Sequence, residues 1–115
     1  MEINDLLLGR RTVHQYTKES VDDQLILAAL KTALYAPNHK QTQPWRFFWL
    51  NSKMRQEVTE LAITLKGQSK DLSEIQKQAL ASKLNSPYAC VALGCLKSDS
   101  ELQSREDYAS VACGV

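Results

Sequence analysis

The sequence predicts a single domain in which helices alternate with strands. Three observations lead to this prediction. A length of 115 residues suits one hydrophobic core. Apolar side chains recur at helical spacing in several segments, whereas residues 46–51 and 88–97 form short, continuous apolar runs typical of strands. The apolar fraction of 43% and the charged fraction of 23% are those of an ordinary globular protein.

The first part of the chain predicts two helices. Residues 3–8 suit a short helix ended by Gly9, because glycine readily takes the left-handed conformation that closes a helix. Ser20 is predicted to cap the second helix. This helix carries so many leucines and alanines that we expect it to be largely buried. Pro37 ends it, because the residue before a proline is pushed out of the helical region.

The second part predicts two strands separated by a pair of helices. Residues 46–51 suit a strand, and residues 52–66 suit a helix that ends at Gly67. A more polar helix follows over residues 71–85. The apolar run at residues 88–97 then suits a strand buried on both faces.

A last helix is expected from Glu101 onward, with Ser100 and Gln103 forming a capping box. Two strands alone make a marginal sheet. We therefore interpret residues 1–115 as one domain that looks truncated, the first part of a larger fold.

Charge and cysteine usage exclude several classes of protein. The net charge is +1 and the basic residues are scattered, so neither nucleic acid nor an anionic membrane is an expected partner. No apolar run is long enough to span a bilayer, and the N-terminus does not look like a signal peptide. Three cysteines without a Cys-x-x-Cys pair indicate reduced thiols, a cytoplasmic protein and no metal site.

The segment GRRTVH, residues 9–14, is a candidate anion site. Arg10 and Arg11 are adjacent, and Thr12 adds a hydroxyl. Guanidinium groups form bidentate bonds to phosphate, and a hydroxyl can bond an anionic oxygen. Taken alone, an Arg-Arg pair is more often a solvated basic turn.

The segment APNHKQTQPW, residues 36–45, is a candidate ligand loop. It is rich in side chains that can bond a heterocycle, and His39 could also meet a phosphate. The structural alternative is that Asn38 terminates the helix, Gln43 bonds the loop backbone and Trp45 anchors the next strand. Each residue taken alone favours that alternative.

Together the two segments resemble the nitroreductase family of FMN flavoproteins, and most closely its small bacterial branch of NAD(P)H nitroreductases. That family shows Arg-Arg-Ser or Arg-Arg-Thr near its start, then Ala-Pro, a polar loop and Gln-Pro-Trp leading into a strand. The matching residues here are Arg10–Thr12 and Ala36–Phe48, and the likeness extends over the whole chain. Two positions depart from the family pattern, namely His14 and Gln41.

The resemblance implies an α+β fold with a central mixed sheet flanked by helices. It also implies an intertwined homodimer that binds FMN at the subunit interface. Carried over by position, one subunit would hold the FMN phosphate and ribityl chain, and a loop of the opposite subunit would line the same cofactor. The residues concerned are Arg10, Arg11 and Thr12 in the first subunit, and Tyr35, Asn38 and His39 in the second.

The reaction implied is hydride transfer from NAD(P)H through FMN to an electron-poor acceptor such as a nitroaromatic or a quinone. The flavin performs that chemistry, so no catalytic acid or base is named. Two alternatives stay open. The chain is either a truncated, catalytically inactive relative that only dimerises, or it supports a different flavin reaction on the same scaffold.

Overall fold

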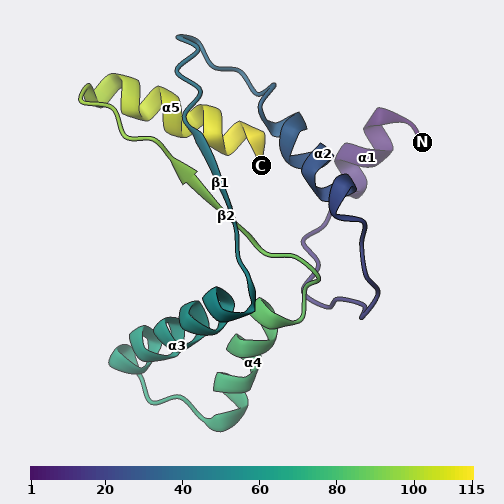
Figure 1. Ribbon diagram of the computed structural model, residues 1–115, viewed down its shortest axis with the longest axis vertical. Coiled ribbons are helices and arrows are strands. Elements are labelled where there is room, and N and C mark those ends of the chain that lie inside the picture. Colours follow the sequence, from purple (N-terminus) through teal and green to yellow (C-terminus); the bar gives the residue numbers. More distant parts are fainter.

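The computed structural model describes residues 1–115 and contains five helices and two strands. Figure 1 shows the strands running through the middle of the molecule, with helices gathered at both ends. This mixture confirms the predicted α+β class. In chain order the elements are α1 (Ile3–Gly9), α2 (Asp23–Ala33), β1 (Trp45–Trp49), α3 (Ser52–Ser69), α4 (Glu74–Asn85), β2 (Val91–Cys95) and α5 (Glu101–Gly114).

The two strands form an antiparallel pair in which Trp45 is paired with Cys95 and Trp49 with Val91. Both predicted strands are therefore confirmed, although β2 is shorter than the apolar run that predicted it. The prediction that β2 is buried on both faces is wrong for this chain, because its side chains are half-exposed or exposed. The reason is that β2 has one neighbouring strand, and α5 is the helix that packs against it.

The α3–α4 helix pair is joined to the strands by one arginine. Arg55 lies on α3 and is 9% exposed. Its guanidinium group donates hydrogen bonds to four backbone carbonyls, which belong to the end of α4, to the segment before β2 and to the residue after β1. The acceptors are Leu50 O at 3.2 Å, Leu84 O at 3.4 Å, Pro87 O at 2.7 Å and Tyr88 O at 3.0 Å. The helix pair and both strand ends are thus held at one point.

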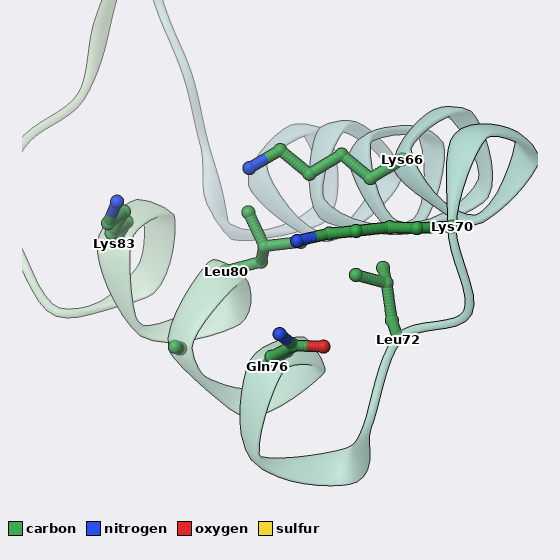
Figure 2. Close-up of a pocket in the computed structure, with 7 residues that line it drawn as sticks. Lys66, Lys70, Leu72, Gln76, Leu80 and Lys83 are labelled. Carbon is green, nitrogen blue, oxygen red and sulfur yellow. The ribbon is translucent and has the colours of Figure 1, made fainter.

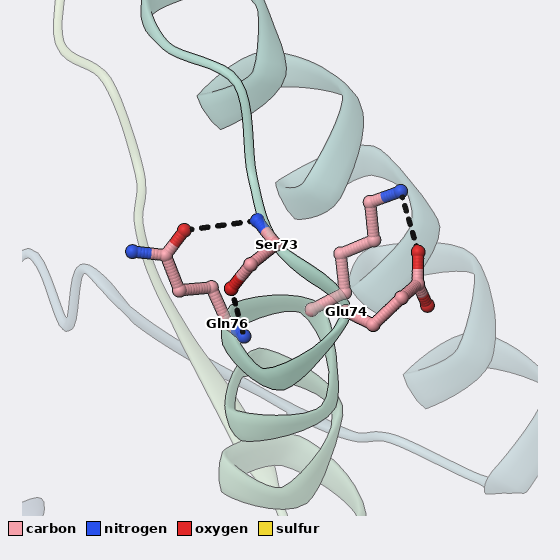
Figure 3. Close-up of polar contacts among 4 residues, drawn as sticks. Ser73, Glu74 and Gln76 are labelled. Atoms are coloured by element: carbon pink, nitrogen blue, oxygen red, sulfur yellow. Dashed lines mark hydrogen bonds and ion pairs between the residues drawn. The ribbon is translucent and has the colours of Figure 1, made fainter.

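Side chains cap the first turns of four helices, where the backbone N–H groups have no partner within the helix. The clearest case is α4, where the Ser73 hydroxyl accepts from Gln76 N at 3.3 Å and the Gln76 side chain accepts from Ser73 N at 3.0 Å (Figure 3). This reciprocal arrangement satisfies two otherwise unpaired donors. An ion pair between Glu74 and Lys77, 3.2 Å long, lies on the same turn.

Several predicted helix ends are displaced by a few residues. The cap of α2 is Asp22, whose carboxylate accepts from Gln24 N at 2.9 Å, and not Ser20. The negative charge of this carboxylate also interacts favourably with the positive, N-terminal end of the helix dipole. Gly9 is the last residue of α1 and Gly67 lies inside α3, and neither adopts a positive φ. The α1 helix does end at Gly9 as predicted, but without the left-handed conformation, whereas α3 continues past Gly67 to Ser69.

The last helix begins where it was expected, but its capping box is incomplete. Ser100 Oγ accepts from Gln103 N at 3.3 Å, as predicted. The Gln103 side chain does not return the bond, because its amide donates to Asp107 instead, at 2.8 Å. Gln103 thus donates to Asp107, the same carboxylate that accepts a hydrogen bond from the loop before β1.

The packed centre of the molecule lies where α5 meets β1 and the end of α2. Trp45 and Val111 are each 6% exposed, and Pro44 is fully buried. Gly114 permits this approach, because an added Cβ atom would lie 3.1 Å from both Ala33 O and Trp45 Nε1. The interior of the chain is therefore a small cluster around one tryptophan.

Most of the remaining apolar surface is exposed. The radius of gyration is 17.1 Å, whereas a compact domain of this length has a value of about 13 Å. Helix α2, expected to be largely buried, has no buried residue, and Leu25 is 65% exposed. Large side chains of α1 are exposed in the same way. No helix is both long enough and apolar enough to cross a membrane.

Candidate functional site

The cationic segment that follows α1 is fully exposed. Arg11 turns back on its own helix, because Nη1 donates to Leu8 O at 2.7 Å and to Arg10 O at 2.8 Å. The Arg10 guanidinium group and the Thr12 hydroxyl make no hydrogen bond. Two of the three predicted anion-binding side chains are therefore free to bond a ligand, and the third is held by backbone carbonyls.

The polar loop after α2 is braced by the Asn38 side chain. Its Oδ1 atom accepts from Gln43 N at 3.1 Å, and its Nδ2 atom donates to Thr42 Oγ1 and Ser110 Oγ, both at 3.3 Å. The backbone carbonyl of Asn38 accepts from Gln41 N at 3.1 Å. Asn38 thus stabilises the shape of the loop and connects it to α5. Its side-chain amide is engaged at both ends within the chain.

The backbone of this loop includes two residues in the left-handed region. Gln41 has a φ of 49° and Gln43 a φ of 47°. For a residue with a side chain this conformation is unfavourable by about 1–2 kcal/mol. Such conformations persist where surrounding contacts impose them, and they are frequent near binding sites.

A buried carboxylate on α5 receives the loop. Asp107 is 3% exposed, and its Oδ1 atom accepts from Thr42 Oγ1 at 2.5 Å and from Gln103 Nε2 at 2.8 Å. The sequence analysis did not single out this residue. A signal was present, because Gln103, Asp107 and Ser110 are spaced by four and three and therefore share one helix face.

The loop and α5 border an open hollow of about 400 Å³. His39 lines the hollow from the loop side and makes no side-chain hydrogen bond. Glu106 lines it from α5, and its Oε2 atom is buried without a hydrogen-bond partner. The other lining residues are Pro37, Asn38, Ala109, Ser110 and Cys113. The predicted residue His39 thus borders a hollow that also offers an unpaired carboxylate oxygen.

Tyr35 faces a different, more apolar hollow. It is 88% exposed and borders a space of about 1020 Å³ together with residues of α1, α2 and the end of α5. Cys113 borders both hollows, so the two are adjacent. Tyr35 and His39 therefore border neighbouring hollows, which meet at the last turn of α5.

Within one chain, the cationic segment and the polar loop do not meet. In Figure 1 the loop between α2 and β1 and the segment after α1 lie at opposite sides of the upper part of the molecule. No hydrogen bond or ion pair joins residues 10–12 to residues 35–41. The single chain therefore keeps the two candidate segments apart, and they are called the two half-sites below.

A separate basic hollow of about 150 Å³ lies between α3 and α4. Figure 2 shows the side chains of Lys66 and Lys70 extending from the end of α3 toward α4, where Lys83 lies. None of the three forms an ion pair. The hollow belongs to the helix pair at the other end of the molecule from the two half-sites.

One tyrosine ties α2 to the segment before β2. Tyr88 donates its hydroxyl hydrogen to Asp23 Oδ1 at 3.1 Å. This hydrogen bond, and then the negative charge of Asp23, raise the pKa of the Tyr88 phenol above its usual value of 10.0. The contact fixes the start of α2, and so the helix that leads into the polar loop.

Comparison with known proteins decides the family. The sequence model of the nitroreductase family matches residues 7–113, which is nearly the whole chain. This chain belongs to the nitroreductase family. The segments that suggested the resemblance, residues 10–12 and 36–48, both lie within the matched range.

Several relatives resemble this nitroreductase-family chain along most of its length. It is 27% identical over 112 residues to "Putative NAD(P)H nitroreductase YfhC" of Bacillus subtilis (strain 168), covering 96% of this chain and 58% of that protein. It is 28% identical over 107 residues to the chloronitrobenzene nitroreductase of Comamonas testosteroni, covering 84% of this chain and 47% of that protein. The chain thus spans about half the length of these relatives, in their N-terminal part.

A solved structure shows the same fold. The crystal structure of the nitroreductase-like family protein from Bacillus cereus matches this nitroreductase-family chain with a TM-score of 0.76 and 21% sequence identity. The match covers 99% of this chain and 60% of that one. The predicted nitroreductase-like fold is therefore confirmed.

Proposed function

We propose that this nitroreductase-family chain is part of an FMN-dependent oxidoreductase that uses NAD(P)H to reduce an electron-poor acceptor. Two findings support the proposal, namely the family match over residues 7–113 and the similarity to relatives named as nitroreductases. The chemistry that bound FMN supplies is hydride transfer from NAD(P)H to an acceptor such as a nitroaromatic or a quinone. The residues of this chain would bind and orient the cofactor.

The free side chains of the cationic segment fit the anionic end of FMN. Arg10 and Thr12 are exposed and unpaired, and a guanidinium group with a neighbouring hydroxyl suits a phosphate. Arg11 would join them by exchanging its two bonds to backbone carbonyls for bonds to phosphate oxygens. Hydrogen bonds between charged partners are the stronger ones, so this exchange is favourable.

The loop side would contact the rest of the cofactor through His39 and Tyr35. Both are exposed, and neither makes a side-chain hydrogen bond. Asn38 would act mainly by shaping the loop, since its amide is engaged with Gln43, Thr42 and Ser110. A neutral imidazole can either donate or accept, so His39 suits the mixed polar edge of a flavin ring.

We further propose that the complete site forms between two copies of the chain. The single observation that carries this is the separation of the two half-sites within one chain (Figure 1). The exposed apolar faces of α1 and α2 support it, because such surface is stabilised by burial against a partner. In this arrangement residues 10–12 of one copy and residues 35–39 of the other would line one cofactor.

Flavin titration tests the proposal. Binding of FMN to the purified chain is followed by quenching of flavin fluorescence, in parallel with light scattering for mass. Arg10→Ala should weaken FMN binding by about one to two decades, which corresponds to the loss of one charge-assisted hydrogen bond. Arg105→Ala is the matched control, because Arg105 is an exposed arginine on α5 that pairs with Glu101.

The outcomes distinguish the proposed function from its alternatives. Equal FMN affinity of the Arg10→Ala and Arg105→Ala variants would remove the phosphate assignment. A dimer that binds no flavin would favour the alternative of a catalytically inactive relative that only dimerises. A monomer that binds FMN tightly would show that the site is complete within one chain.

A further inference from the structure

The hydrogen bonds between the polar loop and α5 run in one fixed direction. Thr42 has a single hydroxyl hydrogen, which it donates to Asp107 at 2.5 Å. Ser110 donates its own hydrogen to Glu106 O at 3.0 Å. Both hydroxyl oxygens can therefore only accept from Asn38, and they take the two hydrogens of its amide. These donors and acceptors therefore fix the orientation of the Asn38 amide, with its nitrogen toward Thr42 and Ser110.

Asp107 is the buried end of this chain of bonds. A carboxylate that is 3% exposed needs hydrogen-bond donors to offset the loss of water. It receives one donor from its own helix, Gln103, and one from the loop, Thr42. Opening the loop therefore removes a donor from a buried charge, which is strongly unfavourable.

The loop backbone also requires external restraint. Gln41 and Gln43 adopt left-handed conformations that the loop would leave if it were free. His39 lies between these residues and the end of α2, and its side chain makes no hydrogen bond that would orient it. The position of His39 thus depends on how firmly the neighbouring backbone is held.

We infer that Asp107 is a positioning residue for the candidate cofactor loop, which it holds through Thr42 and Asn38 so that His39 faces the hollow beside α5. Asp107 contacts neither the hollow-lining His39 nor the cationic segment, so its effect is transmitted by the hydrogen bonds. The inference deepens the proposed function, on which its flavin-binding consequence rests.

The first experiment needs no flavin. Trypsin cleaves after lysine, and Lys40 lies within the loop, so the rate of cleavage at Lys40 reports opening of the loop. Asp107→Ala should raise this rate about tenfold or more, equivalent to ~1.4 kcal/mol. Asp107→Asn keeps an oxygen that can accept from Thr42 and should retain most of the protection. Cleavage after Arg11, in the separate exposed segment, is the internal control and should not change.

A second variant covers a failure of Asp107→Ala to fold. Thr42→Val keeps the shape of an exposed loop residue and removes the hydroxyl that joins Asn38 to Asp107. It should also raise the rate of tryptic cleavage at Lys40 about tenfold, because it breaks the hydrogen bonds from Asn38 through Thr42 to Asp107. Wild-type protection of Lys40 in Thr42→Val would overturn the inference.

The second experiment asks whether the restraint acts through His39. Asp107→Ala should lower FMN affinity about tenfold in the wild-type background and change it little in a His39→Ala background. Additive losses would show that Asp107 does not act through His39. Failure of the wild-type chain to bind FMN would sink the proposed function, whereas the trypsin result would still decide the positioning role.

Discussion

Arg55 offers the sharpest test of how this chain holds its helix pair to its strands. Replacing Arg55 with methionine keeps an unbranched apolar stem and removes the guanidinium group, with its bonds to four carbonyls. A hydrogen bond from a charged donor contributes about 1.5–3 kcal/mol net. The loss should be smaller than four such contributions, because the longest bond is 3.4 Å and carbonyls left without Arg55 can bond to water. We expect the free energy of unfolding to fall by about 3–5 kcal/mol.

Urea unfolding followed by circular dichroism measures the change, at one fixed protein concentration so that association affects every variant equally. Arg55→Lys keeps the charge but cannot reach several carbonyls with a fork of donors, so its loss should be smaller, about 1–3 kcal/mol. It provides a reading if Arg55→Met does not fold. Arg105→Met is the control, because its exposed ion pair with Glu101 contributes about 0–1 kcal/mol. Equal losses in Arg55→Met and Arg105→Met would refute the reasoning.

Two further predictions concern the start of a helix and a titrating phenol. Ser73→Ala removes one half of the capping box of α4 and should reduce the free energy of unfolding by about 1 kcal/mol in the same urea assay, whereas Ser69→Ala should change it less. In the folded chain Tyr88 should ionise above its usual pKa of 10.0, and Asp23→Asn should lower that pKa. The contact with Asp23 therefore stabilises the fold below pH 10 and is lost as the pH rises through the raised pKa. Phenolate absorbance, compared with that of Tyr88→Phe, measures it; an identical titration in Asp23→Asn would contradict the assignment.

Local sequence signals predicted the elements better than their ends. The α3 helix and both strands lie where their apolar spacing placed them, because these patterns are carried by many residues at once. The ends depend on single side chains that compete. Asp22 caps α2 in place of Ser20, because its carboxylate lies two residues later in the chain and accepts from the free Gln24 N–H group. Gly67 is helical because a glycine costs a helix interior only about 1 kcal/mol, and α3 continues to Ser69.

Burial was the part that the sequence could not place. The leucines and alanines of α2 predict an interior helix, and in this chain that helix has no buried residue. An apolar stripe states that a helix face needs covering, but not which surface covers it. For the same reason β2 reads as a fully buried strand and is half-exposed here.

The two loops of the candidate site could be found from sequence, but not the residues that hold one of them. Arg10, Thr12 and His39 belong to short segments whose composition is unusual. Asp107 contacts Thr42 across 65 positions of the chain, so no local pattern relates the two. The same applies to Arg55, whose acceptors are backbone carbonyls of residues that can be of any type.

The placement of the α3–α4 pair between the two strands has a consequence for the order of folding. The partners in the β1–β2 ladder lie about 40 to 50 positions apart along the chain, and closing so long a flexible loop costs ~3 kcal/mol of entropy. Once α3 and α4 have formed, the Arg55 bonds bring Leu50 and Tyr88 together, and the strands start from adjacent ends. The remaining pairs can then close one after another from Trp49 and Val91 toward Trp45 and Cys95. We therefore expect sheet formation in this chain to be a late step that follows the helical hairpin, with a rate that depends on the stability of that hairpin.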